Sequence, residues 1–273
     1  MYEMDEFKLY CGDDAQITDK IIVTIPTIRQ IKEFGEKKYL SAVHTLTSVG
    51  ADLKWQLWDM LQIDYTTIED YDLFIKLISQ LISSKKDLYV ELTTNEERSE
   101  DLKQYSQEEL LDMLVNPLQL TLKDIDFADF KPYILKSNNE VILFNPEKDI
   151  TIDRMIYAQI VDVVRKAHGF KRNGQIPANE TTKRDLIDDA RDEAMLNASK
   201  PYKSSLKPLV SALSVKMGCS VETILDMKIS TFFDAIKRVG KVQDATMLLQ
   251  GAYSGFANLK NIDKSRLDWT ADL

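Results

Sequence analysis

Ser204-Ser-Leu-Lys-Pro-Leu-Val-Ser-Ala-Leu213 begins the stretch of sequence that decides the fold. It continues with Lys216-Met-Gly-Cys-Ser-Val-Glu-Thr-Ile-Leu-Asp-Met227 and with Ile229-Ser-Thr-Phe-Phe-Asp-Ala-Ile-Lys-Arg-Val239. Gly218 can adopt the positive φ that ends a helix, and Ser220 can cap the helix that follows. The pattern predicts a helix, a tight turn, a short helix, a second turn and a third helix. Packed helices of this kind are typical of an interaction module and not of a reaction centre.

The charge is divided unevenly along the 273 residues, of which 44% are hydrophobic. Residues 1–150 hold 16 lysines and arginines against 29 acidic residues, a balance of −13, and residues 151–273 hold 19 against 15, a balance of +4. We predict an acidic α+β domain over 1–150 and a helical domain over 151–273. Chance variation between two solvated surfaces would give the same totals. The acidic part would repel nucleic acid.

Signals for membranes and secretion are not found in the sequence. No apolar run approaches the roughly 20 residues that cross a bilayer, and residues 1–6 lack the basic start of a signal peptide. Cys11 and Cys219 are far apart in a long chain, which favours reduced thiols over a disulfide framework. We expect a cytoplasmic protein.

The other segments predict an α+β fold that is predominantly α-helical, with a small N-terminal hairpin and a short central strand region. Phe7–Cys11 alternates and Lys20–Ile25 is β-branched, so these two segments are expected to form the hairpin. Segments 118–122 and 140–144 are the central strand candidates, and the polar segment 83–105 is expected to be a mobile insertion. Helical spacing or capping residues mark segments 28–35, 39–47, 52–61, 67–81, 106–115, 152–167 and 180–197.

Side chains that could carry chemistry are few. Acidic residues gather on the segment 185–193 and could bind Mg²⁺ or Ca²⁺, but basic residues alternate with them, so we expect a solvated face with ion pairs. His44 is expected to be a packed core histidine, and His168 an imidazolium at the negative end of a helix dipole. No zinc spacing, phosphate loop or nucleophile elbow occurs. We therefore expect no catalytic residue, no metal site and no cofactor.

Several short segments resemble tail-module proteins from phages and prophages of Gram-positive bacteria. They are Phe7-Lys-Leu-Tyr10, Ile22-Val-Thr-Ile-Pro-Thr-Ile-Arg-Gln-Ile31, Phe34-Gly-Glu36, Tyr71-Asp-Leu-Phe74, Phe232-Phe-Asp-Ala-Ile236, Gly251-Ala-Tyr-Ser-Gly-Phe256 and Leu267-Asp-Trp269. The pattern over 220–230 is also similar to C-terminal parts of phage tail assembly chaperones. The resemblance implies a non-enzymatic protein in the host cytoplasm or the virion tail. It implies tape-measure or tail-tube proteins as partners, and self-association is a further expectation.

The segment 204–269 carries more apolar and aromatic side chains than so short a unit can bury alone. Most are expected to pack inside, because an exposed apolar patch is costly in a soluble protein. The candidate partner-binding residues are Phe232, Phe233, Tyr253, Phe256 and Trp269. An alternative is a nucleic-acid-binding regulator, in which 204–241 forms a helix-turn-helix with a basic face of Lys237, Arg238 and Lys241.

Overall fold

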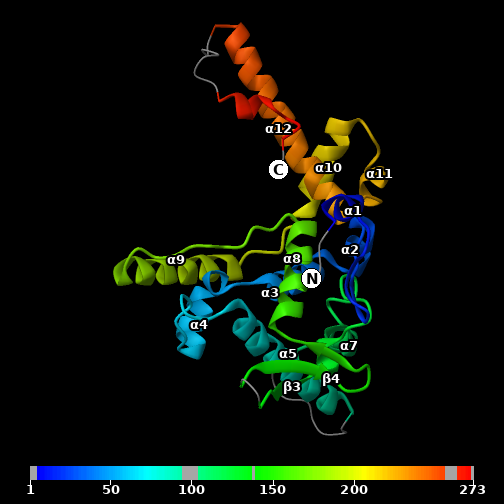
Figure 1. Cartoon of the computed structure of the whole chain (residues 1–273), viewed down its shortest axis with the longest axis vertical. Helices are drawn as coiled ribbons and strands as arrows, with labels where there is room; N and C mark the ends of the chain where they lie inside the picture. The colour runs from blue at the N-terminus through cyan, green and yellow to red at the C-terminus, as the bar shows by residue number, and fades with distance from the viewer. Residues whose placement is uncertain (1–4, 94–103, 137–138, 256–262, 272–273) are drawn as a thin grey trace.

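Helices make up 60% of the structure, beside a two-stranded hairpin and a three-stranded sheet, as the sequence predicts (Figure 1). The computed structural model spans the whole chain, and its described residues are 5–93, 104–136, 139–255 and 263–271. The elements before the second sheet are α1 (Glu6–Cys11), β1 (Ala15–Thr18), β2 (Ile21–Val23), α2 (Ile28–Phe34), α3 (Glu36–Thr47), η1 (Gly50–Asp52), α4 (Lys54–Leu61), α5 (Asp70–Thr93), α7 (Gln107–Leu114) and η2 (Phe127–Asp129). Those that follow are β3 (Lys131–Ile134), β4 (Val141–Asn145), β5 (Ile150–Ile152), α8 (Arg154–Ala167), α9 (Glu180–Ala198), α10 (Leu206–Met217), α11 (Val221–Leu225), α12 (Ile229–Tyr253) and η4 (Lys264–Leu267).

The N-terminal hairpin exists, but its first strand is not Phe7–Cys11. The carboxylate of Asp5 accepts hydrogen bonds from the amides of Phe7 and Lys8, which starts α1, and Gly12 ends it at φ 82°. The hairpin follows, with β1 antiparallel to β2. The prediction was wrong because alternation over five residues was a weaker signal than the two helix caps around it.

Two segments of the central region differ from what the sequence pattern indicates. The segment 83–105, expected to be a mobile insertion, is helical up to Thr93 as a continuation of α5, and residues 94–103 lie outside the described part, so its mobility stays a prediction. Ser83, Ser84, Lys86 and Asp87 are exposed, while Ile82 and Leu88 are buried. Lys85 is also buried and pairs with Asp126 at 3.2 Å. Segment 118–122 forms turns and no strand, because the Asn116 side chain accepts from the amide of Leu118 and donates to the carbonyl of Ile125.

The second sheet is antiparallel in the order β3-β4-β5. Leu143, Phe144 and Asn145 on β4 pair with residues 150–152 on β5, and Asp153 then caps α8. Residues on both sides of position 150 belong to one core cluster, which runs from Leu9 to Phe232. The division into 1–150 and 151–273 therefore stays a prediction, and its boundary falls at a paired strand.

Helix α8 lies at the centre of that core. Its buried face consists of Tyr157, Ile160, Val161, Val163, Val164 and Ala167, at the spacing that a helix requires to present one apolar stripe. It packs against α1, α3, α5, α12, both strands of the hairpin and β5 of the second sheet. This placement confirms the predicted amphipathic helix over 152–167.

The C-terminal part has the predicted succession of helices α10, α11 and α12. Gly218 ends α10 in the left-handed region at φ 63°, and Ser220 caps α11 by accepting from the amide of Thr223. The first half of α12 packs on α1, α8 and α10, and its second half projects away from the body (Figure 1). We call residues 242–253 of this helix the arm.

Candidate partner-binding surfaces

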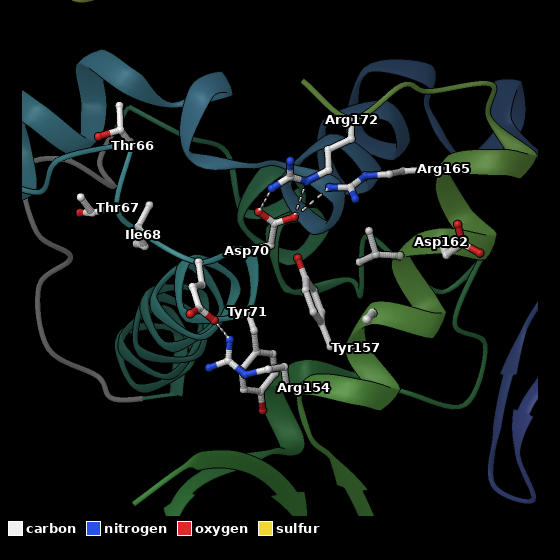
Figure 2. A pocket seen from close by; sticks show the side chains of 13 residues that line it. Thr66, Thr67, Ile68, Asp70, Tyr71, Arg154, Tyr157, Asp162, Arg165 and Arg172 are labelled. Carbon is white, nitrogen blue, oxygen red and sulfur yellow. Dashed lines mark hydrogen bonds and ion pairs between the residues drawn. The ribbon is translucent and has the colours of Figure 1, made fainter. Parts of the chain in front are cut away.

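A polar pocket of about 430 Å³ lies between α5, α8 and the segment around Arg172 (Figure 2). Arg172 donates to both carboxylate oxygens of Asp70 at 2.9 and 3.0 Å, and Arg165 lies 3.8 Å from the same carboxylate. Arg154 pairs with Glu69 and, at 3.1 Å, with Asp72. Each guanidinium already faces a carboxylate, so the side chains that line the pocket form a structural ion-pair network. This network holds α8 and residue 172 against α5.

A chain of buried hydrogen bonds crosses the core near this pocket. Nδ1 of His168 lies 2.7 Å from the carbonyl of Val164, which can only accept, so Nδ1 carries the proton. Nε2 then accepts from the hydroxyl of Tyr39 at 2.7 Å, and that hydroxyl lies 3.0 Å from Oγ1 of Thr121. Burial lowers the pKa of His168 to about 4. The prediction placed His168 correctly at a helix C-terminus, but its imidazole is neutral at physiological pH. His44, expected in the core, is exposed.

The acidic face of α9 forms ion pairs. Arg191 contacts Asp188 at 2.5 Å and Asp59 of α4 at 2.6 Å, and Lys183 contacts Asp64 at 2.6 Å. The contact with Asp59 joins α9 to α4. Of the acidic residues on the segment 185–193, Asp188 is ion-paired and Asp185, Asp189, Asp192 and Glu193 are exposed. Among the described residues, no group of three or more His, Cys, Asp or Glu side chains could hold a metal ion.

An apolar groove of about 470 Å³ separates α2 from α10 and α11. The apolar side chains that line it are the buried Ile28, Leu206, Val210 and Leu225 and the half-exposed Val221. Glu36, Ser204 and Ser211 add polar side chains. Lys32 and Lys207 also line it, both exposed and both without an ion-pair partner among the described residues. We call this site the α2–α10 groove. An apolar floor with basic edges suits the apolar side chains of an acidic amphipathic segment.

The walls of the groove are held in place by polar contacts. Arg29 of α2 donates to Asp226 at 2.7 Å and to Glu222 at 2.6 Å, so α2 is tied to α11. Hydrogen bonding to Arg29 lowers the pKa of Asp226. The backbone adds a bridge, since the amide of Ile28 donates to Met227 and the amide of Ile229 donates to Pro26. The groove is therefore preformed.

Glu36 fixes the start of α10 at one end of the groove. Its carboxylate accepts from the amides of Ser205 and Leu206 at 2.7 and 2.9 Å and from the hydroxyl of Ser204 at 2.5 Å. Burial alone would raise the pKa of Glu36, but these hydrogen bonds outweigh burial and lower it. Glu36 thus caps α10 although it lies 170 positions before Leu206. The side chain of Ser205, at the N-cap position, makes no capping hydrogen bond.

Of the five predicted partner-binding residues, the four that the structure describes do not form one surface. Phe232 is fully buried in the core, where no partner can reach it, and Phe233 packs half-buried beside it. Tyr253 at the end of the arm is 83% exposed and Trp269 is 52% exposed, while Phe256 lies outside the described residues. Sequence reasoning missed the α2–α10 groove because Ile28 and Lys32 meet Val210 and Leu225 only through the fold.

Residues 198–273 match the family model described as the YomV second domain. YomV is a protein encoded by a Bacillus prophage, so the matched domain is associated with phages. No curated protein and no solved structure matches the chain. Within the described residues, no helix is long and apolar enough to span a membrane.

Proposed function

We propose that the protein is a non-enzymatic phage tail morphogenesis protein, similar to tail assembly chaperones, that holds a helical segment of an unassembled tail protein. The α2–α10 groove carries the proposal, because it is an apolar, preformed hollow built largely from the phage-associated segment. The resemblance to tail-module proteins supports the biological setting.

The groove suits the side chains of one helical face. A volume of about 470 Å³ takes several aliphatic side chains, and a helix presents such anchors at positions i, i+3 or i+4, and i+7. The tape-measure protein is the partner we propose, because tail assembly chaperones bind it before the tail is built. Lys32 and Lys207 would pair with acidic residues beside its anchors.

The alternative of a sequence-specific DNA-binding regulator finds less support. A recognition helix presents its N-terminal residues to the bases, but the first turn of α12 faces the body of the protein. Phe232 is fully buried, and Thr231 donates to the carbonyl of Tyr10 at 2.7 Å. Arg238 and Lys241 donate to the carbonyl of Ala271.

Co-expression with the tape-measure protein of the same phage, followed by affinity purification, tests the proposal. Wild type is expected to retain the tape-measure protein, and Val221→Glu to retain about tenfold less, because a carboxylate would be forced into the apolar groove. Val221 is 48% exposed and starts a helix, so glutamate there leaves the fold intact.

Val215→Glu is the matched control, since Val215 is 78% exposed on α10 and does not line the groove. It is expected to bind like wild type. Failure of wild type to retain the tape-measure protein would overturn the proposed partner. Equal retention by both variants would overturn the groove as the site.

A further inference from the structure

The arm carries an apolar seam on a side that the segment around η4 does not cover. The segment around η4 covers one side, where Arg266 pairs with Asp244 at 2.9 Å and Ala245 is buried. On another side lie Val242, Thr246, Leu249 and Tyr253, preceded just before the arm by Val239, and these residues are separated alternately by three and four residues. This is the spacing of a coiled-coil seam, and we call these five residues the outer seam. Val239 is partly buried against the core.

A hollow of about 620 Å³ lies at the base of this seam. It is bounded by Val242 and Met247 of α12, by Met217 at the end of α10 and by Tyr10 of α1, all between 41% and 62% exposed. The charged residues Lys216, Asp234 and Arg238 also line the hollow. The opposite end of the seam carries the protruding Tyr253. The same surface therefore has an aromatic projection at one end and an apolar hollow at the other. The distance between them is about 16 Å, from eleven residues of helix.

The residues beside the arm's part of the seam bear no charge, whereas Arg238 lies beside Val239 at its base. Gln243 and Gln250 flank it on one side, Ala245 and Ala252 on the other, and residues 245–259 contain no charged side chain. In a chain with a net charge of −9, two copies would repel each other over most of their surface, but not here. Because these flanking residues are neutral, they do not favour a partner of opposite charge over a second copy of the chain.

We propose that two copies of the chain associate along the outer seam in antiparallel orientation, each inserting its Tyr253 into the hollow of the other. A two-fold contact requires that the surface complement itself, and antiparallel pairing about the centre between Thr246 and Leu249 brings Tyr253 of one copy opposite Val242 of the other. The interface uses the arm and not the α2–α10 groove, so it stands apart from the proposed function.

We expect the contact to be small, because it involves one face of a single helix and the hollow at its base. Interfaces of less than about 1,200 Å² in total are typical of weak and reversible association. Sedimentation velocity over a wide range of protein concentration should therefore show a monomer–dimer equilibrium in wild type. Tyr253→Glu is expected to raise the dissociation constant about tenfold or more, because it places a charge in the partner's apolar hollow.

Met195→Glu on α9, at a residue 65% exposed and distant from the seam in sequence, is the matched control and should dimerise like wild type. Circular dichroism would establish that the variants keep the same helix content. Wild type that remains monomeric at the highest concentrations, or that dimerises equally well with Tyr253→Glu, would overturn the proposal. A monomer whose seam binds only a different helical protein would overturn it too.

Disulfide trapping tests the orientation in a Cys11→Ser/Cys219→Ala background. Mixing Val242→Cys with Tyr253→Cys protein is expected to give the mixed disulfide in preference to either symmetric one. A preference for symmetric disulfides would contradict the antiparallel pairing. Val221→Glu should leave this association unchanged, so a failed dimer and a failed groove are distinguishable.

Discussion

The buried hydrogen-bond chain from Thr121 through Tyr39 to His168 is the most specific arrangement of single residues in the core. Each polar atom in it has a partner, which is what burial of polar groups requires. The backbone carbonyl of Val164 selects the tautomer. The sequence placed His168 at a helix end, but not its neutrality, because Tyr39 and Thr121 reach it only after folding.

This buried chain of hydrogen bonds predicts how the free energy of unfolding depends on pH. The pKa of His168 is about 4 in the folded protein and about 6.5 in the unfolded chain, so the unfolded chain binds the proton first as the pH falls. The contribution is complete above pH ~6.5 and lost by pH ~4, and amounts to on the order of 3 kcal/mol. In urea unfolding, His168→Gln should show a smaller loss of stability between these pH values than wild type.

His44→Gln is the control for that experiment, since His44 is exposed. Its unfolding free energy should follow the pH dependence of wild type. If the unfolding free energy of His168→Gln falls with decreasing pH as steeply as that of wild type, the imidazole of His168 is protonated or accessible in the folded state.

At the scale of elements, the sequence predicted what local capping and periodicity control. The helices over 152–167 and 180–197 and the turn at Gly218 are where the sequence places them. The errors occurred where a cap or a tertiary contact overrode composition, as at α1 and in the polar half of α5. The groove could not be predicted, because α2 reaches α11 through Arg29, which lies 193 positions from Glu222.

Helix α10 provides a prediction at this scale. Glu36→Gln should weaken its first turn, because the carboxylate accepts four hydrogen bonds at the helix N-terminus and the amide of glutamine keeps only one acceptor oxygen. The expected cost is about 1 kcal/mol at neutral pH. Hydrogen exchange at the amides of Ser205 and Leu206 should accelerate. The folded-state pKa of Glu36 is lowered, so its carboxylate is protonated once the pH falls through that pKa. Below it, the difference in α10 stability between Glu36→Gln and wild type should disappear.

Glu33→Gln, at an exposed acidic residue of the neighbouring α2, should leave exchange at α10 unchanged. Faster exchange in both variants would indicate a general loss of negative charge as the cause, and not the cap.

At the scale of the whole molecule, the core cluster and the β4–β5 pairing both extend across residue 150. We therefore expect one cooperative transition in thermal unfolding, followed by circular dichroism and by tryptophan fluorescence, with coincident midpoints. Trp55 and Trp58 report on α4, and Trp269 on the segment beside the arm. Two separate transitions would instead support independent domains over 1–150 and 151–273.

The central claim is that the α2–α10 groove holds a helical segment of a tail protein. Its most direct test is photo-crosslinking in cells that are producing phage particles, with benzoylphenylalanine in place of Val221 inside the groove or of Val215 outside it. We predict that the Val221 position crosslinks to a helical segment of the tape-measure protein, identified by mass spectrometry, and that the Val215 position does not. Crosslinks to the tape-measure protein from Val215 alone, or from neither position, would contradict it.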